Sequence, residues 1–312
     1  MELWRKIQKT NFTKIEDLAA FLEIDPKRIA TSSFPLNFPR RLAEKVEKGS
    51  LDDPILQQFL PSHYESMETA GFTASPISDH LFQKSPLLLQ KYQGRVLLMP
   101  TSACAMHCRF CFRQNYPYET EKDFTKELQL IKEDPSIYEV ILSGGDPLSL
   151  SDEKLSRLVK DLEKIPHLKL LRFHTRFPIG IPERITPAFT NILKETSLQP
   201  IFILHINHPK EIDDLLLTSL KKLPVPIMTQ TVLLRGINDD TTTLKTLFLT
   251  LVSNGIIPYY LHQLDRITQA AHFDVSIKKG KEIIKALRSI LPGYAVPTYV
   301  QEIPHQDSKT LI

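Results

Sequence analysis

The stretch RVLLMPTSACAMHCRFCF, residues 95–112, joins a short apolar run to a loop that holds three cysteines. The apolar run is rich in leucine and stops at a proline, as expected of a short buried strand. The loop has the spacing Cys104-x3-Cys108-x2-Cys111, and the chain has no other cysteine. Because three cysteines within eight residues cannot form a disulfide framework, they are candidate metal ligands.

Downstream of this stretch, short apolar or β-branched runs alternate with helical patterns. The predicted strands are Arg95 to Met99, Glu139 to Leu142, Lys169 to His174, Ile201 to Ile206, Ile227 to Val232 and Pro258 to His262. The predicted helices are Thr125 to Glu133, Asp152 to Lys164, Pro187 to Thr196, Ile212 to Lys222, Thr241 to Asn254 and Ser276 to Leu291. Such alternation predicts an α/β fold, a partial or full barrel of parallel strands with helices outside.

Upstream of this stretch the texture differs. Short amphipathic pieces, such as Ile15 to Leu22 and Arg40 to Lys48, are separated by turn-prone Asp-Pro and Phe-Pro pairs. We therefore expect an N-terminal helical region over residues 1–90 and a barrel over residues 91–312.

Composition and charge exclude several classes of protein. The chain has 312 residues, of which 42% are hydrophobic and 24% charged, as is usual for a folded protein with a large core. The net charge of +3 is small and the charges are interspersed, which disfavours a nucleic-acid partner. No apolar run is long enough to cross a membrane, and the amino terminus mixes charges with apolar residues. We expect a cytoplasmic protein with no membrane partner.

Polar segments follow several of the predicted strands. The cysteine loop follows the first strand and Ser143-Gly144-Gly145-Asp146 follows the second, while residues 174–176 end the third and residues 262–265 follow the sixth. In an α/β barrel the carboxyl ends of the strands meet at one mouth, which carries the functional residues. We expect these four segments to share one site, although no catalytic role is assigned to His174, Arg176 or His262.

The cysteine loop predicts an iron-sulfur cluster. Three thiolates can bind three irons of a 4Fe-4S cluster and leave the fourth iron for a small molecule with an amine and a carboxylate, such as S-adenosylmethionine (SAM). The alternative is a structural zinc site completed by His107 or a distant histidine. Zinc sites usually pair their cysteines as two C-x2-C units, and this chain has no second pair.

The segment after the second strand supports a SAM site. Gly144 and Gly145 let the backbone approach a ligand closely, and Asp146 offers a carboxylate to the SAM ammonium. The alternative is a tight turn between strand and helix, with Asp146 only capping it.

From about residue 91 onward, the chain resembles the lysine 2,3-aminomutase family of radical SAM enzymes that also use pyridoxal 5′-phosphate (PLP). The resemblance rests on the cysteine loop and on ILSGGDPLSLSDEKL, HINHPKEI, QTVLLRGINDD, PYYLHQLD and PGYAVPTYVQEIPHQDSKT. It implies a partial (β/α)6 radical SAM barrel behind an N-terminal helical region. It also implies an isomerase that binds a 4Fe-4S cluster, SAM and PLP and takes electrons from a donor such as flavodoxin or ferredoxin.

Within the family, LHQLD, AAHF and the SKT ending are most similar to the short branch that makes (R)-β-lysine for elongation factor P. This implies L-lysine as the substrate and a functional link to elongation factor P and its lysyl-transferring ligase. The alternatives are an aminomutase for another amino acid, an enzyme of free lysine catabolism, or a non-catalytic zinc or iron-sulfur protein.

The resemblance also implies roles for single residues. Lys309 matches the lysine that binds PLP covalently, although His305-Gln306-Asp307-Ser308 replaces the glycine run of longer members. Lys91 and Arg95 match contacts to the PLP phosphate. The alternative for Lys309 is a solvated lysine near a frayed end. The alternative for Lys91 and Arg95 is that they are ordinary basic residues before a strand.

Three further residues match the substrate contacts of the family. Arg113 matches the arginine that pairs with the substrate carboxylate, for which a guanidinium fork is suited. Asp265, and Glu302 where longer members carry aspartate, match the pair that binds the distal ammonium. Two carboxylates would repel an acidic substrate. The alternatives are a surface arginine and strand-end salt bridges.

Overall fold

A single sheet of ten strands organises the computed structural model, which describes residues 2–118 and 123–312. The strands are β1 (Gln83–Ser85), β2 (Leu88–Leu89), β3 (Arg95–Leu98), β4 (Glu139–Leu142), β5 (Leu170–Thr175), β6 (Gln199–His205), β7 (Ile227–Val232), β8 (Ile257–His262), β9 (Thr298–Gln301) and β10 (Thr310–Leu311). They are neighbours in chain order, and β3 to β9 are parallel. Since no pairing joins β1 to β10 in the described residues, the sheet is that of a partial barrel.

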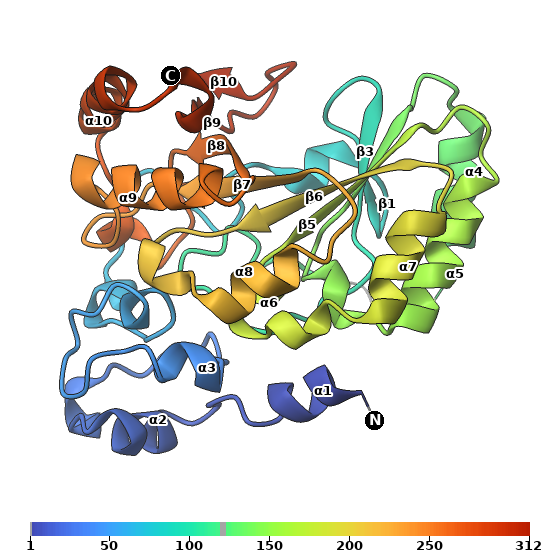
Figure 1. The fold of residues 1–312 in the computed structure, drawn as a ribbon. Coiled ribbons are helices and arrows are strands. Elements are labelled where there is room, and N and C mark those ends of the chain that lie inside the picture. Colours follow the sequence, from blue (N-terminus) through green and yellow to red (C-terminus); the bar gives the residue numbers. More distant parts are fainter. Residues whose placement is uncertain (1, 119–122) are drawn as a thin grey trace.

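Helices cover the outside of this sheet (Figure 1). They are α4 (Thr125–Glu133), α5 (Asp152–Glu163), α6 (Phe177–Gly180), α7 (Pro187–Glu195), α8 (Asp214–Leu220), α9 (Thr241–Val252) and α10 (Ile277–Ile290). In α5, the buried Leu155, Leu158 and Leu162 recur at helical spacing, and the Ser151 hydroxyl accepts from the first turn. The predicted α/β class is confirmed, and a partial barrel is compatible with the order of the strands.

The N-terminal region contains α1 (Leu3–Gln8), α2 (Ile15–Leu22) and α3 (Arg40–Ala43). A short 3-10 turn at Pro26–Arg28 lies between α2 and α3, and three more follow α3, at Leu56–Gln58, His63–Ser66 and Asp79–Phe82. The region packs onto the barrel. The Trp4 ring, for example, contacts the edge of Phe177 with ring centroids 5.4 Å apart. The sheet begins at Gln83, so two strands come from the first 90 residues, and a domain boundary at residue 90 stays a prediction.

Two details of the fold differ from the sequence predictions. The segment predicted as a helix over residues 40–48 is helical only to Ala43. The short strands β1, β2, β9 and β10 were not predicted at all. Further 3-10 turns lie between barrel elements, at Pro147–Ser149, Pro182–Arg184, Pro209–Glu211, Ala271–Phe273 and Gly293–Ala295.

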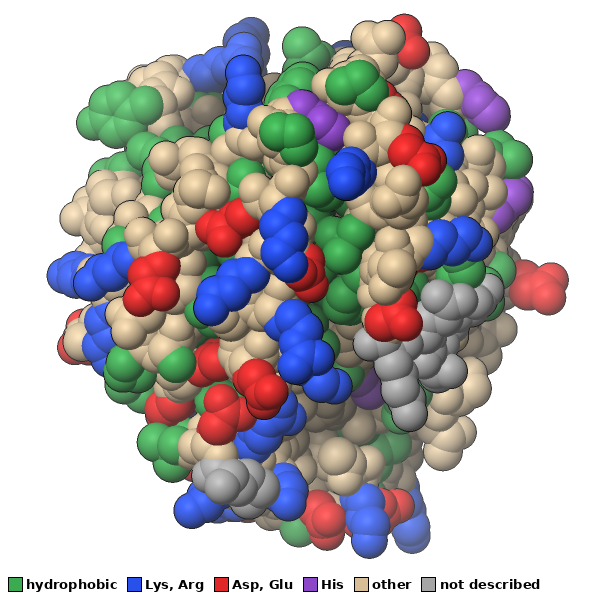
Figure 2. Space-filling model, turned by 90° about the vertical axis from the view of Figure 1, so that its right-hand side faces the viewer, with side chains coloured by type: hydrophobic (Ala, Val, Ile, Leu, Met, Phe, Trp, Pro, Cys, Tyr) green, Lys and Arg blue, Asp and Glu red, His purple; other side chains and the backbone are tan. Residues whose placement is uncertain are grey.

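Charges on the surface are mixed. On the face in Figure 2, basic and acidic side chains alternate over short distances. In the part of the chain that the structure describes, no helix is both long enough and apolar enough to cross a membrane.

Candidate functional site

A cavity of about 410 Å³ lies at the carboxyl ends of the strands, a volume within the usual range for small-molecule sites. It brings together every site residue that the sequence predicted. These are Cys104, Cys108, Cys111, Gly144, Gly145, Asp146, Lys91, Arg95, Arg113, Asp265, Glu302 and Lys309. Their common location supports one shared site, while the role of each residue stays a prediction.

The cysteine loop is held by the N-terminal region. Asn11 donates from Nδ2 to the carbonyl of Ala105 at 2.7 Å, and the amide of Arg109 donates to the carbonyl of Gln58 at 2.9 Å. The Arg109 guanidinium forms a buried ion pair with Glu65. The N-terminal region therefore fixes the loop that carries the thiols.

The three cysteine side chains are partly buried. Burial raises the pKa of Cys104 and Cys108 above the usual range and raises that of Cys111 to about 11. His107 does not join them, because its ring packs against Phe34 and its Nδ1 lies 2.9 Å from the carbonyl of Pro35. The described residues include no group of three or more His, Cys, Asp or Glu close enough to bind one metal ion.

The turn after β4 is hydrogen-bonded to the backbone of the cysteine loop. Gly144 has φ = 103°, which favours glycine. The Gly145 amide donates to the carbonyl of Thr101 at 2.9 Å, and the Asp146 amide donates to the carbonyl of Ala103 at 2.8 Å. Gly145 thus lets this turn approach the cysteine loop closely, while Gly144 lies against Met99. The close approach expected from the sequence was toward a ligand, whereas the one observed here is toward the chain itself.

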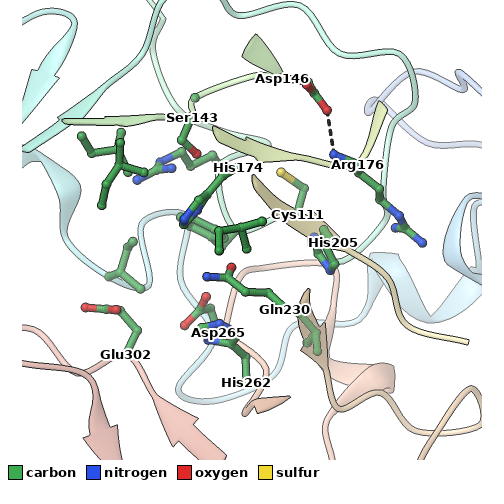
Figure 3. Close-up of a pocket in the computed structure, with 18 of the residues that line it drawn as sticks. Cys111, Ser143, Asp146, His174, Arg176, His205, Gln230, His262, Asp265 and Glu302 are labelled. Atoms are coloured by element: carbon green, nitrogen blue, oxygen red, sulfur yellow. Dashed lines mark hydrogen bonds between the residues drawn. The ribbon is translucent and has the colours of Figure 1, made fainter. Parts of the chain in front are cut away.

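The Asp146 carboxylate is engaged by the chain itself. It accepts from the Thr175 hydroxyl at 2.7 Å and from the amides of Leu148, Arg176 and Phe177 at 3.0, 2.8 and 2.9 Å. The contact with Arg176 is drawn in Figure 3. The structure thus shows the capping contacts that were the alternative for Asp146, and a direct contact with the SAM amine stays a prediction.

A side chain at residue 145 is expected to prevent cluster assembly. A Cβ atom there would lie 2.5 Å from the carbonyl oxygen of Ala103 and 2.5 Å from the carbonyl carbon of Ser102, so the cysteine loop would have to move. Gly145→Ala should bind several-fold less iron per chain after anaerobic reconstitution. Gly293→Ala is the matched control, because nothing lies within 4 Å of its Cβ position. Equal iron content in both variants would contradict this account of the turn.

Lys309 lies across a hairpin from Glu302. The pairing of β9 with β10 sets Thr310 opposite Gln301, which brings the preceding lysine back to the end of β9. Lys309 Nζ donates to Glu302 Oε2 at 2.6 Å, and the lysine side chain is only 24% exposed. Lys309 is therefore held in the cavity and is not a solvated residue at a frayed end.

Glu302 connects several groups at this end of the cavity. It also forms an ion pair with Lys91 and accepts from the Tyr92 hydroxyl at 2.5 Å. Burial would raise the pKa of Glu302, but the Lys309 charge and the hydrogen bonds from Lys309, Lys91 and Tyr92 lower it to about 2. Glu302 thus makes the strand-end ion pairs that were its alternative reading, and contact with a substrate ammonium stays a prediction.

Asp265 is half-buried and faces the same cavity (Figure 3). Burial raises the pKa of Asp265 to about 7, although the nearby Lys309 charge opposes the rise. A further cation beside this carboxylate would stabilise its charged form. Asp265 is therefore suited to receive an ammonium group from a ligand.

Arg113 is buried and pairs with Asp79 of the N-terminal region. Its Nε donates to Asp79 Oδ2 at 2.7 Å and its Nη2 donates to Oδ1 at 3.3 Å. Arg113 is therefore not a surface arginine. Within residues 2–118 and 123–312, no hydrogen-bond partner is found for its Nη1, and contact with a substrate carboxylate stays a prediction.

The structure adds residues that no sequence pattern had marked. Asp79, Tyr92, Arg172 and Gln230 all line the cavity. Arg172 pairs with the buried Glu139 and, with Lys91 and Arg95, is a third cation that lines the cavity. Gln230 begins the quoted segment QTVLLRGINDD and Arg172 lies in a predicted strand, but neither had been assigned to the site, and no signal existed for Asp79 or Tyr92.

Three histidines face the cavity (Figure 3). His205 and His262 end strands β6 and β8, and His174 is the residue before the last in β5. Burial lowers the pKa of His205 to about 3 and lowers those of His174 and His262 well below the usual range, so all three are neutral. Their Nε2 atoms have no hydrogen-bond partner among the described residues. The cavity thus presents three neutral polar atoms that a ligand could satisfy.

The residues present fit the groups that the sequence implied. Three partly buried thiols around one cavity suit an iron-sulfur cluster. At the Lys309 end, the cations of Lys91, Arg95 and Arg172 suit a phosphate, and the lysine amine suits an aldehyde. The unpartnered histidine atoms are also consistent with a polar occupant.

Comparison with known proteins gives a consistent result. Residues 93–174 match a family model described as a 4Fe-4S single cluster domain. The chain is 42% identical over 289 residues to an L-lysine 2,3-aminomutase of Haemophilus influenzae, covering 90% of this chain and 86% of the relative. It is 38% identical to that of Escherichia coli, covering 96% of this chain and 91% of the relative.

One further curated relative and one solved structure are also similar to this chain. The L-lysine 2,3-aminomutase of Clostridium subterminale is 35% identical, covering 85% of this chain and 65% of the relative. A solved structure of a radical SAM methyltransferase from Sphaerobacter thermophilus aligns with 14% identity and a TM-score of 0.48, covering 69% of this chain and 68% of that one.

Proposed function

Because this chain belongs to the L-lysine 2,3-aminomutase family, we propose that it moves the α-amino group of L-lysine to the β-carbon. The product, β-lysine, has the same atoms as the substrate, so the enzyme is an isomerase. The observation that carries the proposal is the single cavity in which three cysteines and Lys309 occur together with Arg113, Asp265 and Glu302.

The cofactors supply the difficult chemistry and the chain supplies position. When bound, the 4Fe-4S cluster with SAM supplies radical hydrogen abstraction, and PLP supplies a carbonyl that holds the migrating nitrogen. Cys104, Cys108 and Cys111 would hold the cluster. Lys309 would carry PLP, and Lys91 and Arg95 would bind its phosphate with help from Arg172.

The substrate would lie between charges of opposite sign. Arg113 would pair with the lysine carboxylate through Nη1 while Asp79 fixes the guanidinium. Asp265, with Glu302, would receive the distal ammonium. Because both acids carry negative charge when an ammonium is bound, they favour lysine over glutamate. Fixing both ends of lysine selects which carbon faces the radical.

Substitution of Asp265 by asparagine is expected to weaken lysine binding and to stabilise the unliganded protein at high pH. Since burial raises the pKa of Asp265 to about 7, the stability it contributes is complete below about pH 4 and is lost as pH rises through 7. The neutral asparagine escapes that loss, which is on the order of a few kcal/mol. Thermal unfolding of both proteins at pH 5 and pH 8, with lysine titrations, measures both effects.

The control for this prediction is Asp307→Asn, because Asp307 is exposed. Equal destabilisation of Asp265→Asn at both pH values, or unchanged lysine binding, would contradict the assignment. Lysine affinity of the natural protein should rise with pH up to about 7, because binding requires the charged carboxylate.

The fate of the product is a finer part of the proposal. We propose that the product is (R)-β-lysine, that it serves elongation factor P through its lysyl-transferring ligase, and that flavodoxin or ferredoxin donates the electron. The LHQLD, AAHF and SKT segments of this chain support the short branch. Deleting the gene should remove the β-lysyl mass from elongation factor P, and an unchanged mass would overturn this part alone.

The substrate is tested by a panel of amino acids. Reconstituted protein is given L-lysine, L-ornithine, L-glutamate or norleucine, which has a neutral side chain in place of the lysine ammonium. Conversion of lysine alone supports the proposal. Conversion of glutamate with no conversion of lysine would favour an aminomutase for another amino acid. A colourless protein that carries zinc would favour the non-catalytic reading.

A further inference from the structure

Arg176 is a buried arginine beside the cysteine loop to which the proposed function gives no task. It follows β5 and is 6% exposed. Its Nη1 donates a hydrogen bond to Cys108 Sγ at 2.9 Å. A guanidinium is positively charged at every physiological pH, so this contact places a fixed positive charge against one of the three thiols.

Four other groups hold Arg176 in this position. Nη2 donates to Gln58 Oε1 at 2.6 Å and to Glu211 Oε2 at 3.1 Å. The guanidinium carbon lies 5.0 Å from the Phe59 ring centroid and 5.5 Å from that of Phe110. A side chain held by two acceptors and two rings cannot turn away from the sulfur without breaking these contacts.

The supporting groups are themselves fixed. The Gln58 amide donates to Glu211 Oε1 at 3.0 Å, and Gln58 Oε1 accepts from the Asn207 amide at 3.0 Å. Glu211 is fully buried. Gln58 belongs to the N-terminal region and Glu211 follows β6, so two separate parts of the chain converge on this one arginine.

We infer that Arg176 sets the reduction potential of the cluster held by the cysteine loop. Reduction adds one electron from a one-electron reductant and no proton, so the cluster becomes more negative. A hydrogen bond and a positive charge at a cysteine sulfur stabilise the more negative state and raise the potential. Arg176 contacts both Cys108 and Glu211, so the positive charge of the guanidinium is the nearer of the two charges to the Cys108 sulfur.

This inference rests on the proposed function only in requiring that the cysteine loop binds an iron-sulfur cluster. It does not depend on which amino acid is the substrate. Arg176 is a positioning residue for the electron, because it touches a cysteine ligand and not the substrate. The Glu211 carboxylate should act in the opposite direction. In Glu211→Gln the negative charge next to Arg176 is removed, so the positive charge of Arg176 should act more strongly on the cluster and raise its reduction potential.

The test is an anaerobic redox titration of the full chain with reconstituted iron, without SAM, PLP or lysine. The reduced cluster is followed by electron paramagnetic resonance during titration with dithionite. At the same solution potential, the ratio of reduced to oxidised cluster should be about tenfold lower in Arg176→Gln than in the natural protein. This corresponds to a reduction potential about 59 mV lower for a one-electron couple. Arg176→Lys, which retains the charge but not the fork, should shift less.

Arg184→Gln is the matched control. Arg184 is also fully buried and paired with a carboxylate, but its partners are Asp152 and the carbonyls of Leu148 and Leu150. It should leave the potential unchanged.

An unchanged potential in Arg176→Gln at full iron content would overturn the inference. Loss of iron from both the glutamine and the lysine variants would also overturn it, because Arg176 would then be needed to assemble the site and not to tune it. Neither result depends on lysine turnover, so the proposed reaction fails or succeeds separately.

Discussion

Lys309→Ala is expected to abolish β-lysine formation while the cluster and SAM cleavage persist. Among the described residues, Lys309 and Lys91 are the two lysines whose amines pair with Glu302 in the cavity. Loss of a group that carries out covalent chemistry should lower turnover by at least about 10³-fold. Iron content and SAM cleavage by dithionite-reduced protein should stay near those of the natural enzyme, because the cysteine loop is untouched.

The link between Lys309 and PLP can be read directly. Borohydride reduction followed by peptide mass analysis should find PLP on Lys309, and the visible absorbance of bound PLP should be lost from Lys309→Ala. Lys278→Ala is a suitable control, because Lys278 lies exposed on α10. Labelling of a different lysine, or absorbance retained in Lys309→Ala, would contradict the assignment.

Cys108→Ala is expected to lose the cluster and all turnover while PLP still binds. Two thiolates cannot hold three irons, and the substitution also leaves the Arg176 guanidinium facing no sulfur. Iron per chain and visible absorbance after anaerobic reconstitution measure the first effect, and PLP titration measures the second. Loss of both cofactors together would indicate a misfolded protein.

His107→Ala tests the competing zinc reading in the same experiment. The ring lies against the Pro35 carbonyl and Phe34, so its removal should leave iron binding near that of the natural protein. A protein that binds zinc and loses it when His107 is removed would contradict the iron-sulfur assignment.

Most of the barrel could be predicted because its elements are periodic. The sequence prediction for residues 227–232 coincides with β7, and the prediction for residues 125–133 coincides with α4. Strands β2 and β10 have two residues each, which is too short for any apolar alternation, so only tertiary pairing defines them. The N-terminal helices were predicted with less accuracy at Arg40, where the helix ends after one turn.

The common location of the predicted site residues in one cavity was predictable, but their interaction partners there were not. Strand-end positions and motif matches predicted a common location for Cys108, Asp265 and Lys309, and all three line one cavity. No local pattern in the sequence could show that Asp79 pairs with Arg113, which follows it by 34 residues. Ion pairs between distant segments depend on how those segments pack, and this information is absent from single-sequence periodicity.

The fate of the lysine nitrogen tests the central claim most directly. Anaerobically reconstituted protein with SAM, PLP and dithionite is incubated with L-lysine labelled with ¹⁵N at the α-amino group, and the product is analysed by mass spectrometry and NMR. The account predicts β-lysine that retains the label at the β-carbon. Absence of β-lysine from protein with full iron and PLP, or β-lysine without the label, would contradict it.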